Sequence, residues 1–559
     1  MGGGGPAGRV LLLIPLAWAI GCLSDASPRD DEGGAVAAPE VDGEPLADHR
    51  TPSWIWSAPD GATGFRARID DGEWVELEVD TTWLTAPSDL EDGDHLFEVQ
   101  ARDPAGLAGP SGSFTTTVAP IVRAGDDVWR QNRTMATSPL AHPCAVSPGP
   151  AANLGDVHAA LDADADLIEL DAVDAASILG DPALRAGDQV VVLTLAETGE
   201  AAVRSLLDTL AANRADYARA GRHLVLRGDR GGLDTVHQLL DTRDYLLLRP
   251  YVRTAVSFAR DQATRSLVVD SADRGDALVD LDVRTPELMS LRALAHARGL
   301  GVAVHGVPES SGDVFLAVLR DTVDAVSVAG SVTDARAIVE RADALFFVDP
   351  SAVEDETADS LPYRGDDGAS RVLAVNHDNQ PLLSVGQMDD AMPGGRLVFD
   401  PAATRRGSLH DADAPPGGGV LIAVSARLAE TELPDDTIMT ILAKSEHSGW
   451  ALDLSNPAGD DPTVMRFSVY VDGAYHYTTV PTAGLRTDRA YLIIGAYDGD
   501  GEVGLWIDND ATGVDAVSAS GDILNNDYPV LIGGDPGDEY RYFFAGEIDL
   551  VSGQSWAPL

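Results

Sequence analysis

The chain has 559 residues, too many for a single hydrophobic core, and this length predicts about three or four domains. Its 90 acidic residues outnumber the 39 basic ones, giving a formal net charge of −51. Because such a surface repels the phosphates of nucleic acid, the composition excludes nucleic acid as the main partner. It is compatible with divalent cations, or simply with solubility.

The N-terminus has the pattern of an export signal. One Arg precedes an apolar run from Val10 to Ile20, which is too short to span a membrane, and small residues and Cys22 follow. The segment AIGC resembles the lipobox of bacterial lipoproteins. The resemblance implies that residues 1–22 are a lipoprotein signal peptide and that Cys22 is acylated. The protein would then be exported and held in a membrane by this lipid anchor, at the outer membrane or the cell surface. An ordinary signal peptide with an incidental Cys is the alternative.

Two segments follow the signal. Residues 23–49 are rich in Asp, Pro, Gly and Ala and are predicted to form a disordered linker. Residues 50–118 alternate short apolar and polar runs between frequent turn residues, which predicts a small β-sandwich. The Trp54/Trp56 pair and the segment RIDDGEW resemble bacterial immunoglobulin-like or fibronectin-III-like modules. Modules of this kind space and present other domains, so no chemistry is assigned to this one.

Residues 120–350 alternate β-rich runs with helical patterns, which predicts a (β/α)₈ TIM barrel. A doubly wound open sheet is the alternative, but no glycine-rich phosphate loop follows the first strand. The predicted strands are TMATSPLAH (134–142), DLIELDA (166–172), QVVVLTLAE (189–197), RHLVLRGD (222–229), YLLLRPYV (245–252), ALVDLDV (277–283), GVAVHGV (301–307) and DAVSVAG (324–330).

The second of these strands carries two carboxylates on one face. Glu169 and Asp171 are two positions apart, so their side chains point the same way. Like charges side by side are unfavourable unless a cation lies between them or one of them is protonated. The pair therefore indicates either a metal site or the solvated end of a strand. In a barrel the active site lies at the carboxyl ends of the strands, where His142 and Glu197 are also expected.

The segments LAHPCA and VHAALDADADLIELDAV resemble the opening of the glycerophosphodiester phosphodiesterases and the related phospholipase-C-like phosphodiesterases. The segment LRALAHARGLGVAVHGVPE resembles the far end of the same barrel. The resemblance implies a phosphoric diester hydrolase acting on glycerophosphodiesters or phospholipid headgroups. His142 would be its general acid or base, and Glu169, Asp171 and Glu197 would bind a divalent metal, Mg²⁺ or Ca²⁺.

The sequence departs from this family at several positions. Pro143 replaces the family's Arg, Gly199 replaces its Lys, and residues 172–200 lack its second catalytic His. His305, at the end of the run GVAVH, is the candidate replacement for that catalytic His, with a structural role as the alternative. If the chemistry has been lost, the barrel is a scaffold in a non-catalytic adhesion or carbohydrate-binding protein.

Residues 365–559 return to short alternating strands and predict a β jelly roll. The segments TILAKSEHSGWALDL and RAYLIIGAYDGDGEVGLWID resemble laminin-G-like domains of the concanavalin-A-like fold. That resemblance implies a glycan or protein ligand at the rim, sometimes bound through Ca²⁺. Asp498, Asp500 and Glu502 are candidate Ca²⁺ ligands, and a solvated acidic hairpin is the alternative. The whole chain is thus predicted to be multidomain: β-sandwich, TIM barrel and jelly roll.

Overall fold

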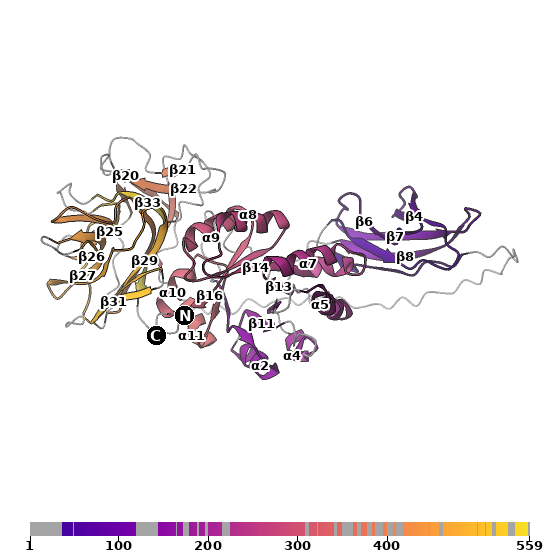
Figure 1. Ribbon diagram of the computed structural model, residues 1–559, viewed down its shortest axis with the longest axis horizontal. Coiled ribbons are helices and arrows are strands. Elements are labelled where there is room, and N and C mark those ends of the chain that lie inside the picture. The colour runs from indigo at the N-terminus through magenta and orange to yellow at the C-terminus, as the bar shows by residue number, and fades with distance from the viewer. Residues whose placement is uncertain are drawn as a thin grey trace, which may run out of the picture.

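The chain forms three units, which lie in a row in Figure 1: β-sheets near the N-terminus, a parallel sheet with helices in the middle, and a large antiparallel unit at the C-terminus. Within the described residues, none of the helices combines the length and hydropathy needed to cross a bilayer. The computed structural model describes residues 36–47, 50–118, 144–163, 165–171, 178–186, 189–195, 199–214, 224–307, 312–320, 322–339, 344–348, 361–365, 370–376, 383–385, 395–399, 406–409, 418–445, 448–457, 462–499, 501–508, 510–516, 521–534 and 543–556.

The N-terminal unit has a three-stranded sheet, ordered β1-β3-β6, and a five-stranded sheet, ordered β2-β8-β7-β4-β5. Aromatic side chains fill the space between them, with Trp54 stacked on Phe97 at a ring-centroid distance of 4.8 Å. The strands are β1 Val41–Gly43, β2 Leu46–Ala47, β3 Ser53–Trp56, β4 Gly64–Ile69, β5 Val75–Glu78, β6 Trp83–Thr85, β7 Gly93–Arg102 and β8 Ala108–Val118.

This unit begins earlier than its composition indicates. Strands β1 and β2 lie inside the predicted linker 23–49, yet β1 pairs with β3 and β2 pairs with β8. The backbone packs closely here, because a Cβ added at Gly112 would lie 2.0 Å from the carbonyl oxygen of Pro39. The prediction of a linker is therefore wrong for residues 41–47. Strand pairing uses backbone groups, so a segment poor in apolar side chains can still form an edge strand.

The central unit is built on a nine-stranded sheet, ordered β10-β11-β12-β13-β14-β15-β16-β17-β9, and every pairing in it is parallel. Its two end strands are separated in the chain by Pro148 and Gly149 alone, so the curled sheet begins and ends at one place. Its strands are β9 Ala145–Ser147, β10 Pro150–Ala151, β11 Leu167–Asp171, β12 Val190–Thr194, β13 Leu224–Gly228, β14 Val252–Phe258, β15 Leu278–Asp282, β16 Gly301–Val307 and β17 Ala325–Val328.

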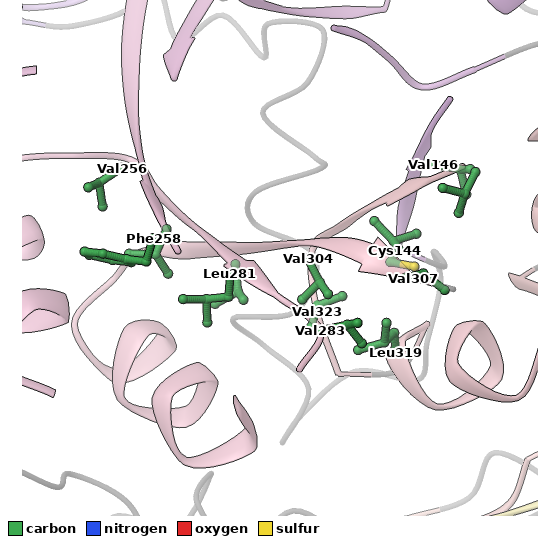
Figure 2. Close-up of a cluster of buried hydrophobic side chains, with 14 of the residues drawn as sticks. Cys144, Val146, Val256, Phe258, Leu281, Val283, Val304, Val307, Leu319 and Val323 are labelled. Atoms are coloured by element: carbon green, nitrogen blue, oxygen red, sulfur yellow. The ribbon is translucent and has the colours of Figure 1, made fainter. Parts of the chain in front are cut away.

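Helices cover one face of this sheet. Figure 2 shows part of the core between the sheet and these helices, including Phe258, Leu281 and Val304 from the strands and Leu319 from a helix. The helices are α2 Leu154–Asp162, α4 Pro182–Ala186, α5 Glu200–Ala212, α7 Arg230–Leu240, the 3₁₀ helix η2 Leu246–Tyr251, α8 Arg265–Arg274, α9 Leu288–Ala297, α10 Gly312–Leu319 and α11 Val332–Val339.

One predicted strand of the central unit differs from the structure, and another cannot be compared with it. The predicted strand 245–252 is wrong: most of it is η2, and the strand β14 follows it. Pro250 lies in that segment and cannot donate a backbone hydrogen bond to a sheet. The predicted first strand, 134–142, lies outside the described residues. A multidomain, β-rich fold with a curled parallel sheet is confirmed.

The C-terminal unit is a sixteen-stranded antiparallel arrangement. Its two halves face each other across one core, where Phe346 stacks on Trp450 at a centroid distance of 6.2 Å. The strands are β18 Ala344–Val348, β19 Leu361–Gly365, β20 Ser370–Asn376, β21 Leu383–Val385, β22 Gly395–Phe399, β23 Arg406–Ser408, β24 Gly419–Leu428, β25 Thr437–Ser445, β26 Gly449–Asn456, β27 Val464–Val471, β28 Ala474–Pro481, β29 Ala490–Tyr497, β30 Glu502–Ile507, β31 Asp510–Ala516, β32 Leu531–Ile532 and β33 Gly546–Trp556.

Strand β18 belongs to this unit, although the sequence placed it in the central domain 120–350. It pairs with β19 and β33. Its sequence, ALFFV, is an uninterrupted apolar run, and such a run fits a buried strand of either unit.

The central and C-terminal units share a hydrophobic core. Leu421, Ile494 and Leu550 of the C-terminal strands belong to the same buried cluster as the central helices. Two buried hydrogen bonds cross this interface. The Ser290 hydroxyl lies 2.8 Å from Asp549 Oδ2, and the Gln554 amide donates to the carbonyl oxygen of Ala317 at 2.6 Å. The C-terminal unit is thus joined to the central one by packed apolar side chains and buried polar contacts.

Candidate functional site

The face of the central sheet opposite the helices has an apolar layer near the amino ends of its strands. Strand residues alone make up this cluster, and most are small or β-branched. They are Ala145, Leu167, Val190, Val192, Val225, Ala255, Leu278, Ala303 and Ala325.

A layer of polar residues follows, nearer the carboxyl ends. On six neighbouring strands, the residue two positions beyond a member of the apolar cluster is polar, and alternation along a strand puts it on the same face. This polar layer consists of Glu169, Thr194, Arg227, Ser257, Asp280 and His305.

Arg227 connects the two sides of the polar layer. Its Nη2 atom donates to Glu169 Oε2 at 2.6 Å and to Thr194 Oγ1 at 2.9 Å. Its Nη1 atom lies 3.4 Å from Asp280 Oδ2. The guanidinium from β13 therefore spans from β11 to β15 and compensates a buried carboxylate at each end.

Electrostatics keep Arg227 charged inside the sheet. Burial lowers the pKa of its guanidinium, but the negative charges of Glu169 and Asp280 outweigh burial and leave the pKa above its ordinary value. A buried pair of this kind is tolerated only when charges are matched and hydrogen bonds are made. Both conditions are met here.

His305 forms the second pair in the layer. Its Nδ1 atom lies 2.9 Å from Asp280 Oδ1, while Ser257 donates to Asp280 Oδ2 at 3.2 Å. Since a carboxylate only accepts hydrogen bonds, Nδ1 carries the proton. Burial lowers the pKa of His305, but its hydrogen bond to Asp280 and the nearby charges raise it more, and the pKa lies above the ordinary value. The His305 side chain remains 32% exposed.

Asp280 was not singled out from the sequence, although a signal was present. Strand β15 reads LVDLD and strand β11 reads LIELD, so the acidic pair Asp280/Asp282 repeats the pattern of Glu169/Asp171. Asp282 is held by its neighbour Arg284, whose Nε atom lies 3.0 Å from Asp282 Oδ1. Burial raises the pKa of Asp282, but the hydrogen bonds from Arg284 outweigh it and leave the pKa lowered.

The predicted metal ligands are only partly within the described residues. Glu169 and Asp171 share a face as expected, with Glu169 buried and Asp171 exposed. Glu197 and His142 lie outside the described residues. Within the described part of the chain, no three His, Cys, Asp or Glu side chains gather as a possible metal site. The metal site therefore remains a prediction.

Carboxylates outnumber guanidiniums at this end of the sheet. Glu169 and Asp280 pair with Arg227, Asp282 pairs with Arg284, and Asp171 ends β11 exposed. The donor set is all oxygen, as Mg²⁺ and Ca²⁺ prefer. One Glu169 oxygen binds Arg227, so a metal would share this carboxylate with the guanidinium.

The other predicted sites lie elsewhere. Asp498 and Glu502 close the hairpin between β29 and β30, where the Glu502 backbone N–H donates to Asp498 Oδ1 at 3.1 Å. Asp500 and Cys22 lie outside the described residues. The hairpin contact is that of a turn, and the predicted Ca²⁺ site stays a prediction.

Comparison with known proteins gives little further information. No protein-family model matches the chain, and no curated protein matches it. Among solved structures, the binding domain of Paraclostridial Mosquitocidal Protein 1 matches with TM-score 0.29 and 10% identity, over 38% of this chain and 49% of that one. The binding domain of botulinum neurotoxin serotype D matches with TM-score 0.28 and 11% identity, over 39% and 48%. The match spans about half of each of these two chains, and likeness this low carries no argument about function.

Proposed function

We propose that the central unit is a closed (β/α)₈ barrel that hydrolyses phosphodiesters of the glycerophosphodiester or phospholipid-headgroup class at its polar layer. The observation that carries the proposal is the Asp280–His305 pair, set beside Arg227 near the carboxyl ends of the strands. Barrel enzymes place their active sites at that end of the sheet.

The strand order supports a closed barrel. Strands β9 and β10 pair with opposite ends of the sheet and are two residues apart, so together they serve as the first of eight barrel strands. The inner apolar layer then corresponds to the packed interior that such barrels need. On the same reading the C-terminal unit is a laminin-G-like jelly roll.

His305 is the proton-transfer group in this proposal. Asp280 fixes the ring through Nδ1, which leaves Nε2 as the atom that exchanges a proton with the substrate or a water. The raised pKa of His305 makes the protonated form available near neutral pH, as a general acid requires. By the family resemblance, His142 would be the second member of the acid–base pair.

Arg227 and the carboxylates position the substrate and a metal. A Mg²⁺ or Ca²⁺ ion held by Glu169, Asp171 and Glu197 would neutralise the phosphate and stabilise the charge that develops during attack. Arg227 fixes the Glu169 carboxylate through a 2.6 Å hydrogen bond and is therefore a positioning residue. The lipid anchor at Cys22 would hold this hydrolase at a membrane surface.

The test uses the full purified chain with bis(p-nitrophenyl) phosphate and with glycerophosphocholine, after EDTA treatment and after adding Mg²⁺ or Ca²⁺. We expect metal-dependent hydrolysis that falls by about 100-fold or more in His305→Gln and in Glu169→Gln/Asp171→Asn. His158→Gln is the matched control, because His158 also contacts an Asp but lies on the outer helix α2.

Two outcomes would overturn the proposal: no hydrolysis with either metal, or hydrolysis that His305→Gln leaves unchanged. The first result would favour the alternative in which the barrel is a scaffold without chemistry, and the second would remove His305 from the reaction.

A further inference from the structure

The far edge of the C-terminal unit carries a group of tyrosines. Strand β28 ends the strand order and pairs with β27, with Tyr475 opposite Tyr470 and Tyr477 opposite Ser468. Intervening residues of β27, such as Val469, point into the core. The tyrosines therefore lie on the outer face of this sheet, which we call the tyrosine face. Figure 1 shows β27 on the side of the unit away from the central helices.

The rings of the tyrosine face are exposed and yet held in place. Tyr475 is 41% exposed and Tyr477 is 55% exposed. Tyr470 and Tyr475 form an edge-to-face pair with centroids 4.9 Å apart, and the Tyr470 hydroxyl donates to the carbonyl oxygen of Gly473 at 2.9 Å. Rings ordered before a ligand arrives lose less entropy on binding.

A buried ion pair supports Tyr477. The Arg466 guanidinium lies 5.9 Å from the centre of the Tyr477 ring. The same guanidinium makes two hydrogen bonds to the buried Asp453 carboxylate, at 2.9 and 3.0 Å. Because Asp453 neutralises Arg466, this part of the face does not present a free positive charge to an anion.

A loop extends the tyrosine face at one end. The Leu524 backbone N–H donates to the carbonyl oxygen of Tyr470 at 3.0 Å, and the Leu524 side chain is 53% exposed. Acidic residues border this end. Asp472 lies in the turn after Tyr470, Asp522 lies in the loop, and Gly521 is near enough that an added Cβ would be 3.7 Å from Asp472 Oδ1.

We infer that the tyrosine face binds the chain of a neutral polysaccharide. Aromatic rings offer flat apolar surfaces with a polar tip, which suits the C–H face of a pyranose ring and its hydroxyls. The bordering carboxylates accept hydrogen bonds from sugar hydroxyls, whereas they repel uronates and sulfates. The net charge of −51 adds to that repulsion. This inference stands on other residues than the proposed hydrolysis and does not depend on it.

The test measures binding of the fluorescently labelled full chain to an array of gluco-, manno- and galacto-oligosaccharides, with alginate and heparin fragments as acidic probes. Tyr475→Ala/Tyr477→Ala removes both exposed rings, and Tyr475→Phe/Tyr477→Phe keeps them. Trp83→Ala is the matched control, because Trp83 is 41% exposed in the N-terminal unit.

We expect at least one neutral class to bind, with about tenfold weaker binding in the alanine variant and binding within about threefold of the parent in the phenylalanine and Trp83 variants. If the double variant loses its native circular dichroism, binding is measured instead on Tyr477→Ala, which removes only the more exposed ring. The inference is overturned if no neutral probe binds, if acidic probes bind better, or if removing the rings leaves binding unchanged. Phosphodiester hydrolysis is measured on the same variants and should not change, so failure of one proposal is distinguishable from failure of the other.

Discussion

Arg227 donates a hydrogen bond of 2.6 Å to Glu169, one of the three residues predicted to bind a divalent ion. The two residues come from β13 and β11, and the hydrogen bond between them passes over β12, where Thr194 accepts a second one from the same nitrogen. The Glu169 side chain is 4% exposed and that of Arg227 is 12% exposed. The pair therefore links strands across the inner face of the sheet and supplies a permanent positive charge there.

Replacing Arg227 should destabilise the central unit. Arg227→Met keeps the length of the side chain but leaves Glu169 buried without its partner. Breaking a buried ion pair on one side costs about 3–5 kcal/mol in the free energy of unfolding. Thermal unfolding followed by circular dichroism, with proteolysis to assign the transition to the central unit, measures the loss.

Arg230→Met is the matched control for this change. Arg230 pairs with Asp270, but both side chains are about half exposed, at 55% and 44%. A surface pair contributes about 0–1 kcal/mol, so a small effect is expected. Equal losses in the two variants would contradict the structural role assigned to Arg227.

The His305–Asp280 pair should make stability depend on pH. The pKa of His305 is raised in the folded protein, so the pair's contribution is fully present below the unfolded value of about 6.5. That contribution is lost as the pH rises through the folded pKa. The stability difference between the parent and His305→Gln should therefore be larger at pH 5.5 than at pH 9, as measured by denaturant unfolding.

His158→Gln again provides the control. His158 contacts Asp181 on the outside of the unit with its side chain 47% exposed, so solvent screens the interaction. Its stability difference should change little between the same two pH values. A His305 difference that is constant with pH would contradict the raised pKa.

The sequence predicted most strands of the central unit correctly, but it missed one strand in the middle of the sheet. Alternating β and helical patterns located β11, β12, β13, β15, β16 and β17, because buried parallel strands are apolar runs with clear ends. It missed β14, where the apolar run YLLLRPYV has the composition of a strand but forms η2 instead. Local composition cannot distinguish a strand from a 3₁₀ helix in so short an apolar run. Pairing with β13 decides it, and this pairing begins only at Val252.

The partner of Glu169 could not be predicted for a different reason. Arg227 lies 58 residues farther along the chain, and the strand order β11-β12-β13 brings the two together. The repeated pattern LIELD and LVDLD could have drawn attention to Asp280, which was not singled out from the sequence, but its pairing with His305 depends on the register between β15 and β16. Spacing along one strand predicts which side chains share a face, and it does not predict what stands opposite.

The interface between the central and C-terminal units should make them resist proteolysis together. Leu550 is fully buried within the shared cluster. Leu550→Asp places a charge there, and because an unpaired buried charge is strongly unfavourable, the two units should separate. Limited proteolysis should then cut between them at protease levels that leave the parent intact. Leu107→Asp, at a position that is 68% exposed in the N-terminal unit, should change nothing, and the prediction fails if both variants behave like the parent.

Lys444 should anchor the loop that borders the tyrosine face. It is the only lysine of the chain and is fully buried, and its ammonium donates to the carbonyl oxygens of Asn526 and Tyr528, each at 2.9 Å. Lys444→Met removes these donors, and leaving buried acceptors unsatisfied costs about 1–3 kcal/mol. Amide hydrogen exchange across 521–528 should therefore accelerate while the strands of the central unit stay protected. Arg486→Met, which breaks an exposed pair with Asp488, is the control and should leave exchange in this loop unchanged.

In the parent, an amine-reactive ester should modify Lys444 only on unfolding, because the folded chain shields the ammonium from solvent. Rapid labelling of Lys444 in the native protein would show that it does not hold the loop.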